Sequence, residues 1–434
     1  MSVSENQSRR KIDQAERAIL SGHLKSVEDH LFNGIIPFWF QRARDTQYGG
    51  FLTNSDEQGR LLPTPEKYAN TQCRLIWWFS TLHRRFPDLA QAAEFASGGV
   101  DFLIKHFWDE KYGGFFWKVQ RDGAPLDSAK IVYGQSFCIY ALSEYYLATR
   151  DPRGLDYASR TFDCLQKYAA DTLRGGYYEN LTQEWAPEAK GFAGGDRKGL
   201  DTHMHLMESF TTLAAASGEA IHRRKLLEVT DLITTRMIDP VTGCGLNQFD
   251  LAFKSLPAIA IKRTWNGERQ GEQPANPVDT TSYGHNLELE FLMRLALKTA
   301  QVEAGSYQAP LRRLLDHAVQ HGVDWEFGGI YRDGLRATGE AIVKEKEFWQ
   351  HSESLVGFLD GYEAFGDRRY LDAFSKIWEF ARDYMIVKGV GEWRTLLDRQ
   401  GKPIDANIGN PWKVSYHTGR AMVESRERMM RLLA

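Results

Sequence analysis

A short glycine-containing segment recurs six times along the chain and constrains its fold more than any other feature. Examples are YGGFLTNSDEQG from Tyr48, YGGFFWKVQRDG from Tyr112 and FGGIYRDGLRATG from Phe327. The second glycines of the six copies lie 64, 62, 69, 84 and 62 residues apart, and they are Gly50, Gly114, Gly176, Gly245, Gly329 and Gly391. One copy would be an ordinary hairpin in which glycine supplies unusual backbone angles. Six copies at nearly constant spacing predict a repeat architecture.

Two helices are predicted between successive copies. Segments that lead into a copy are amphipathic with helical spacing, as in residues 225–238, whereas segments that follow a copy are apolar on most of their circumference, as in residues 73–82. We therefore expect a half-exposed outer ring around a buried inner ring. Six helix pairs closed into a ring make an all-α (α/α)6 barrel of twelve helices, with six short β-hairpins on its active-site side. No Pro- or Ser-rich linker interrupts the chain, so residues 1–434 are predicted to form one catalytic barrel domain.

Charge and composition argue against several classes of function. The 54 basic and 57 acidic residues are mixed along the chain and give a net charge of −3, which does not favour a nucleic-acid partner. No apolar run approaches the ~20 residues that span a bilayer, and the polar N-terminus MSVSENQSRRKIDQAE lacks the apolar core of a signal peptide. Four scattered cysteines are typical of reduced core thiols. We expect a cytoplasmic protein, a monomer or homodimer, that acts on a small molecule.

Polar and aromatic residues gather where the inner helices are predicted to begin. Because each hairpin leads into an inner helix, all six helix N-termini should surround one pocket. The residues at these starts are Arg74, Tyr133, Gln135, His203, His205, Glu208, His285, Glu288, Trp349, His351, Glu353, Trp412, Lys413, His417 and Arg420. A lone histidine at a helix start is usually structural, but we assign His205, His285 and His417 to one shared position in the repeat, which favours a functional role. Tryptophans at a pocket mouth can stack on the apolar faces of sugar rings.

At these same positions the chain resembles the N-acylglucosamine 2-epimerase superfamily, and within it the cellobiose 2-epimerases. The segments KIVYGQSFCIYALSEYY, THMHLMES, SYGHNLE, SESLVGFLDGY and WKVSYHTGR are similar to family motifs in the expected order. The resemblance covers nearly the whole chain and implies an (α/α)6 barrel whose chemistry needs no metal and no cofactor. It implies that His285 and His417 form the acid/base pair and that His205 assists ring opening. Residues that resemble substrate-binding positions are Arg74, Tyr133, Glu288, Trp349 and Trp412, and we place His351 and Glu353 beside them.

Several features separate the chain from the cellobiose 2-epimerases it resembles. Phe348 and Trp349 stand where those enzymes usually have two tryptophans, and Asp201 stands at a position that resembles an asparagine. His351 resembles the branches that act on N-acylglucosamine and mannose. Residues 253–280 are longer than the resemblance implies. Because this insertion ends just before an inner helix, we expect it to cover the mouth of the pocket and to set substrate length.

Two histidines suit the inversion of C2 in an aldose. Epimerisation removes a proton from carbon and returns one to the opposite face, so each group must titrate near neutrality, as histidine does at about 6.5. A helix N-terminus and Arg420 favour a neutral His417, whereas Glu288 favours a protonated His285. We predict that His417 removes the proton from the gluco configuration and that His285 returns one.

The intermediate of this reaction is a cis-enediolate, whose negative oxygens need preorganised donors. Arg74 and Tyr133 are the candidates. The sugar ring must open first, and we assign proton transfer at the ring oxygen to His205, with His351 in reserve.

Five alternatives stay open on sequence grounds. An aldose–ketose isomerase, such as a mannose isomerase, uses the same enediolate but returns the proton to C1, and an N-acylglucosamine 2-epimerase differs only in its substrate. A glycoside hydrolase on the same barrel would need carboxylates as its central groups. A non-catalytic sugar-binding protein is also possible, as is a metal site formed by His205, His285, Glu288 and His417.

Overall fold

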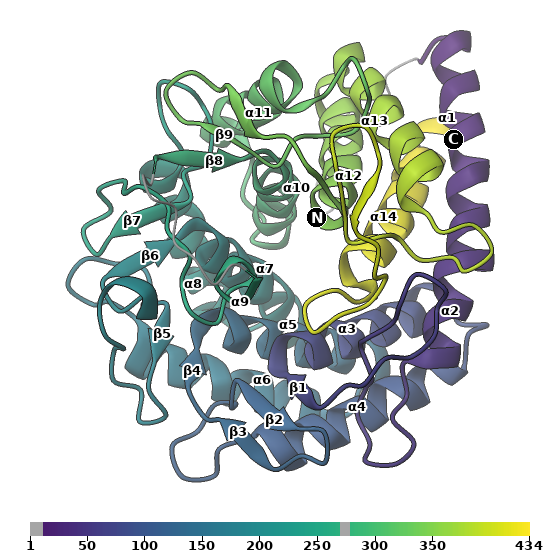
Figure 1. The fold of residues 1–434 in the computed structure, drawn as a ribbon. Helices are drawn as coiled ribbons and strands as arrows, with labels where there is room; N and C mark the ends of the chain where they lie inside the picture. Colours follow the sequence, from purple (N-terminus) through teal and green to yellow (C-terminus); the bar gives the residue numbers. More distant parts are fainter. Residues whose placement is uncertain (1–11, 270–277) are drawn as a thin grey trace, which may run out of the picture.

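Six inner helices form a closed ring in the computed structural model, which describes residues 12–269 and 278–434. Each inner helix packs on the next one along the chain, and the last packs back on the first, so the ring has no open end (Figure 1). The inner helices are α3 (Ala69–Arg85), α5 (Val132–Thr149), α7 (Leu200–Ser217), α10 (Tyr283–Thr299), α12 (Phe348–Phe365) and α14 (Ser415–Leu433). Helix α5 is buried along most of its length, as its apolar sequence predicts.

An outer ring covers the inner one. Its first member is the continuous run of α1 (Gln14–His30), η1 (Leu31–Ile35) and α2 (Ile36–Arg42), and α1 packs on α14. The other outer helices are α4 (Gln91–Phe107), α6 (Pro152–Cys164), α8 (Ala220–Leu232), α11 (Gln308–His317) and α13 (Arg368–Phe380). Helix α6 buries Gly154, Ala158, Thr161 and Phe162, the one-sided spacing of an amphipathic helix. The prediction of an (α/α)6 barrel is confirmed.

Short helical turns complete these elements. Five outer members carry a π-helical turn, in η1 and in η2 (Leu165–Ala169), η4 (Ile233–Met237), η6 (Ala318–Gly322) and η7 (Ala381–Met385). Two short 3-10 turns, η3 (Gly191–Ala193) and η5 (Gly305–Tyr307), lie in loops, and the short helix α9 (Trp265–Arg269) lies in the 253–280 insertion. Within the described ranges, no helix is both long and apolar enough to cross a bilayer. Most of the polar N-terminal segment and the stretch 270–277 of the insertion lie outside the described residues.

Small sheets connect neighbouring repeats at the end of the barrel where the inner helices begin. The strand that leads into an inner helix pairs with the hairpin of the next repeat, as β1 pairs with β2 and β8 with β9. The strands are β1 (Glu66–Tyr68), β2 (Lys118–Gln120), β3 (Pro125–Asp127), β4 (Lys130–Ile131), β5 (Asn180–Leu181), β6 (Arg197–Gly199), β7 (Gln248–Asp250), β8 (Thr280–Ser282), β9 (Asp333–Leu335), β10 (Ala341–Val343), β11 (Lys346–Glu347), β12 (Leu396–Leu397) and β13 (Pro403–Asp405). A bridge between Ser55 and Gly409 joins the first repeat to the last. The hairpins therefore brace the ring as well as shaping its mouth.

A buried ion pair recurs under the hairpins, and the glycine pattern alone did not reveal it. Asp109 accepts backbone N–H groups of its glycine turn and also pairs with Lys130 at 2.9 Å. The lysine stands two residues before α5, and lysines at the same place before four other inner helices also make buried ion pairs, although in the last repeat the carboxylate is Glu392, which follows the turn glycine Gly391. These pairs are Lys67–Asp45, Lys198–Asp171, Lys346–Asp324 and Lys413–Glu392. The fourth repeat has Thr281 at this place, and its Asp239 pairs with Arg336 instead.

We expect Lys130→Met to destabilise the protein by about 3–5 kcal/mol, because it leaves Asp109 buried without its cation. Urea unfolding followed by circular dichroism measures the change. Arg44→Met is the matched control, since it breaks the exposed Arg44–Glu94 pair and should cost less than about 1 kcal/mol. Equal losses in the two variants would contradict a structural role for the buried pair.

Candidate active site

One cavity of about 290 Å³ opens at the hairpin end of the barrel, where all six inner helices begin. Side chains that lie far apart in the sequence meet there because the ring is closed. Eight of the ten residues predicted for the site line this cavity, namely Arg74, Tyr133, His205, His285, Glu288, Trp349, Trp412 and His417. The other two, His351 and Glu353, do not line it.

The three predicted catalytic histidines occupy two helical positions rather than one. His285 and His417 are the third residues of α10 and α14, whereas His205 is the sixth residue of α7. Three residues along a helix correspond to about 4.5 Å of rise, so His205 stands one turn deeper in the barrel. The shared repeat position that we expected is therefore correct for His285 and His417 only. The sixth-position residues of the other inner helices include Arg74, Glu288, Glu353 and Arg420.

The fourth residue of an inner helix has a structural job, and it explains His351. The ring Nε2 of His351 accepts the backbone N–H of Ile330 at 3.2 Å, and Nδ1 lies 2.9 Å from the backbone oxygen of Glu347. The same bond to a glycine turn is made by the side chains of Gln72, Gln135, His203 and Asn286. Gly329 is required opposite, because a Cβ there would lie 2.4 Å from the His351 ring.

His351 therefore does not occupy the substrate-contacting position that we expected. Burial and the nearby Lys346 lower the pKa of His351 to about 3, which keeps the ring neutral and able to accept the Ile330 N–H. Burial likewise lowers the pKa of His203 to about 4. Both histidines do the work that glutamine does in the first two repeats.

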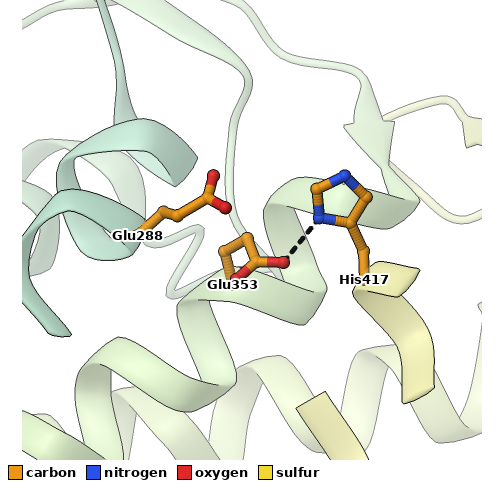
Figure 2. Close-up of side chains that lie close together, drawn as sticks. All are labelled: Glu288, Glu353 and His417. Carbon is orange, nitrogen blue, oxygen red and sulfur yellow. Dashed lines mark hydrogen bonds and ion pairs between the residues drawn. The ribbon is translucent and has the colours of Figure 1, made fainter. Parts of the chain in front are cut away.

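His417 presents one ring nitrogen to the cavity and binds a carboxylate with the other. Its Nδ1 lies 2.6 Å from Oε1 of Glu353, which leaves Nε2 for a ligand (Figure 2). Burial, followed by the guanidinium groups of Arg74 and Arg420, lowers the pKa of His417 well below its usual range. Burial raises the pKa of Glu353 well above that of an ordinary glutamate. Glu353 therefore contacts the ring of His417 and does not line the cavity.

His205 is held as a cation by two carboxylates. Its Nδ1 lies 2.8 Å from Oε2 of Glu208, and its Nε2 lies 3.2 Å from Oδ1 of Asp201. Burial alone would lower the pKa of His205, but the bonds to Asp201 and Glu208 raise it to about 10. The imidazolium is therefore a proton donor at neutral pH.

Asp201 is a site residue that the predicted list lacked. It lines the cavity, and the same oxygen that faces His205 lies 3.5 Å from Nε2 of His285. The carboxylate beside His285 is thus Asp201, whereas Glu288, for which we expected that role, pairs with Arg420. The signal was present in the chain, since Asp201 and His205 stand four residues apart on one helix.

Both histidines of the predicted pair pack against one tryptophan. The ring centroid of Trp349 lies 4.5 Å from that of His285 and 5.9 Å from that of His417. His285 and His417 therefore flank a common wall of the cavity, although they come from helices far apart in sequence.

Arg420 fills the space between the buried carboxylates beneath the cavity. Ligand atoms of Glu288, Glu353 and His417 lie within 4.8 Å of one another, which is close enough to hold a cation (Figure 2). The guanidinium of Arg420 already pairs with Glu288 and Glu353. A metal ion at this place would have to compete with that built-in cation. His205, which we included in the alternative metal site, instead binds Glu208 and Asp201.

Arg74 and Tyr133 form the donor pair of the cavity. One guanidinium nitrogen of Arg74 donates to the backbone oxygen of Trp412 at 2.9 Å, and the other donates to the hydroxyl of Tyr133 at 2.7 Å. Because that hydroxyl accepts from Arg74, its own proton is available for a ligand. Burial raises the pKa of Tyr133, so the phenol keeps its proton.

The described part of the 253–280 insertion lines part of the cavity and contacts several repeats. Residues 258–261 and 263–266 line the cavity. The indole of Trp265 donates to Glu347 at 2.6 Å, while Glu268 accepts from the hydroxyl of Tyr68 at 2.7 Å and from the indole of Trp412 at 3.3 Å. Trp412 is consequently covered, with 7% of its surface exposed.

The comparisons with known proteins identify the family to which this (α/α)6 barrel belongs. The model of the N-acylglucosamine 2-epimerase (GlcNAc 2-epimerase) family matches residues 49–421, and the chain belongs to this family. Family membership makes it an isomerase, a carbohydrate 2-epimerase that acts on a small-molecule sugar.

Individual relatives cover nearly the whole chain. The chain is 30% identical to the cellobiose 2-epimerase of Bacteroides fragilis over 412 residues, which are 92% of this chain and 97% of that protein. The structure of cellobiose 2-epimerase from Spirochaeta thermophila is similar with a TM-score of 0.85 and 26% identity, covering 97% of this chain and all of that one. A D-mannose isomerase shares the fold, with a TM-score of 0.80 at 19% identity over 96% of this chain and 100% of that one.

We expect His351→Gln to retain activity close to that of the unmodified protein, because glutamine makes the same bond to a glycine turn in the first two repeats. His351→Leu should lower stability by about 1–3 kcal/mol, since the buried N–H of Ile330 then has no acceptor. Initial rates and the thermal unfolding midpoint measure the two effects. A hundredfold loss of activity in His351→Gln would indicate that His351 takes part in catalysis.

Proposed function

We propose that the protein interconverts gluco- and manno-configured sugars at C2 of the reducing end, and that it does so with two histidines and without a cofactor. The observation that carries this proposal is the shared wall at Trp349, against which His285 and His417 both pack. Two bases that enter one cavity from different helices can reach opposite faces of a planar intermediate. A single base could remove a proton but would return it to the same face.

The reaction begins with opening of the sugar ring. His205, held as a cation, gives its Nε2 proton to the ring oxygen O5 while the C1–O5 bond breaks and its electron pair goes to O5. The proton of O1 passes to the carboxylate of Asp201, which lies beside His205, and O1 becomes the aldehyde oxygen. General acid–base assistance of this kind is worth roughly 10²- to 10⁴-fold.

Proton transfer at C2 follows. Nε2 of His417 removes the C2 proton, and Glu353 stabilises the resulting imidazolium through Nδ1. Arg74 and Tyr133 donate to the oxygens of the cis-enediolate, where negative charge develops. His285 returns a proton to the other face and produces the epimer.

The double variant His285→Gln/His417→Gln should have no measurable epimerase activity, because neither face of C2 then has a base. Each single variant should lose roughly 10²- to 10⁴-fold. In deuterium oxide, the unmodified protein should place deuterium at C2 of the product. Mass spectrometry and NMR of the products measure both results, and epimerase activity in the double variant would refute the two-histidine mechanism.

Product analysis also separates the alternatives. Cellobiose, mannose and N-acetylglucosamine are incubated separately with the protein. A C2 epimer from the first two supports the proposal, a ketose indicates an aldose–ketose isomerase, and turnover of the third alone indicates an N-acylglucosamine 2-epimerase. Binding of all three sugars without turnover would indicate a sugar-binding protein.

We further propose that the described part of the 253–280 insertion, residues 253–269 and 278–280, covers the mouth of the cavity and limits substrate length. Glu268 ties this insertion to Tyr68 and Trp412, across the opening from its own repeat. A second sugar unit that extends out of the cavity would meet Trp265 and Glu268. The insertion therefore favours a monosaccharide over a disaccharide.

Glu268→Gln should raise the ratio of kcat/KM for cellobiose to that for mannose by several-fold, because a neutral amide holds the insertion less firmly at Tyr68 and Trp412. Steady-state kinetics with both sugars measure the ratio. Lys254→Gln is the matched control, since Lys254 is an exposed residue of the same insertion and should leave the ratio unchanged. An unchanged ratio in Glu268→Gln would contradict the limit on length.

A further inference from the structure

A continuous chain of buried contacts joins His205 to His417 beneath the cavity. His205 binds Oε2 of Glu208 through Nδ1, and the other oxygen of Glu208 accepts from Nη1 of Arg420. Nη2 of Arg420 forms an ion pair with Oε2 of Glu353 at 2.7 Å, and Oε1 of Glu353 lies 2.6 Å from Nδ1 of His417. Three side chains on three helices, Glu208 on α7, Arg420 on α14 and Glu353 on α12, thus connect two histidines that have separate tasks in the proposed function.

We propose that Glu208, Arg420 and Glu353 are positioning residues that couple the charge of His205 to the proton affinity of His417, so that loss of the His205 proton makes His417 a stronger base. The proposal rests on the proposed function for its place in the reaction. The coupling itself is between the side chains of His205 and His417, and it exists in the sugar-free protein.

The competition for Arg420 gives the coupling its direction. When His205 is cationic, it shares the negative charge of Glu208 with Arg420. The ion pair between Arg420 and Glu208 is then weaker, and the ion pair between Arg420 and Glu353 is stronger. When His205 becomes neutral, Glu208 can pair fully with Arg420, and Glu353 is freer to accept from Nδ1 of His417. Each shift favours a protonated His417, because a hydrogen bond to a carboxylate stabilises the imidazolium.

Tyr416 keeps Glu208 available for this role. Its hydroxyl donates to both oxygens of Glu208, at 2.8 and 2.9 Å, and receives a bond from Nη1 of Arg420. Glu208 and Arg420 are each about 3% exposed, so water does not screen the chain. Arg420, Glu208 and Tyr416 are therefore fixed relative to one another as a unit.

Every charged group around His417 bears on its titration. Arg74 faces it from α3, His205 from α7, His285 from α10 and Arg420 from its own helix, and the Coulombic interactions of His417 with these groups lower its pKa. Glu353 on α12 and Glu288 on α10 lie close to the His417 ring, where a negative charge favours the protonated form of His417. Among the cations, His205 is a donor whose charge changes during ring opening, when its proton moves to O5.

The experiment titrates histidine rings by NMR in the sugar-free protein, with His417 assigned from a His417→Gln spectrum. His205→Gln should raise the proton affinity of His417 at least tenfold, because a cation at the end of the chain is removed. In a Glu208→Gln background the chain is broken, and the same His205→Gln substitution should shift His417 by less than half as much.

The control is Glu424→Gln. Glu424 is a carboxylate of α14 that pairs with Arg85 and Arg428, outside the chain, and its loss should leave the effect of His205→Gln at full size. Equal shifts of His417 with and without Glu208 would overturn the proposal in favour of simple through-space repulsion. No shift of His417 in His205→Gln, including a ring that stays neutral at every pH at which the protein is folded, would overturn it as well.

Failure of this proposal and failure of the proposed function give different results. The titration needs no sugar, so coupled histidines in a protein that turns over none of the tested sugars would contradict only the proposed function. Epimerisation with uncoupled histidines would contradict only the coupling.

Discussion

The site depends on the ion pairs that the guanidinium of Arg420 forms. This guanidinium lies inside the inner ring and pairs with Glu208, Glu288 and Glu353, which come from α7, α10 and α12. Three buried carboxylates would repel one another strongly without a cation, and a buried cation would be equally costly without them. Their mutual compensation fixes the floor of the cavity. Because each carboxylate belongs to a different helix, the same contact also holds four inner helices in register around the barrel axis.

Successive positions of the inner helices divide the work. The third position carries His285 and His417 to the cavity wall, and in five of the six inner helices the fourth position anchors a glycine turn through an amide or a neutral histidine. The sixth position supplies buried charged groups that line the cavity, such as His205 and Glu288, or lie beneath it, such as Arg420. Because the repeats share one backbone geometry, a residue type changes its meaning with its position. A histidine at the fourth position is structural, whereas a histidine one residue earlier lines the cavity.

The sequence predicted the barrel and most of the lining of the cavity, but not the partners of the lining residues. Its glycine spacing was sufficient for the fold, since a recurring turn of fixed length admits few closed arrangements. The prediction for His351 was wrong, because the sequence is the same whether the ring of a histidine at a helix start faces the cavity or a backbone N–H. Prediction failed for Asp201 as well, because the second contact of that carboxylate is with His285 on another helix, 84 residues further along the chain. The pattern of lysines two residues before the inner helices was present in the sequence and could have been read from it.

The sequence by itself determined the periodic features: the number of repeats, the alternation of half-exposed and buried helices, and the end of the barrel at which functional residues gather. Each of these follows from local spacing, which the chain carries along its length. Only the tertiary structure decided which carboxylate meets which histidine, and hence that His205 is held charged while His417 is held neutral. Those charges depend on contacts between helices and on exclusion of water, and neither exists until the ring has closed.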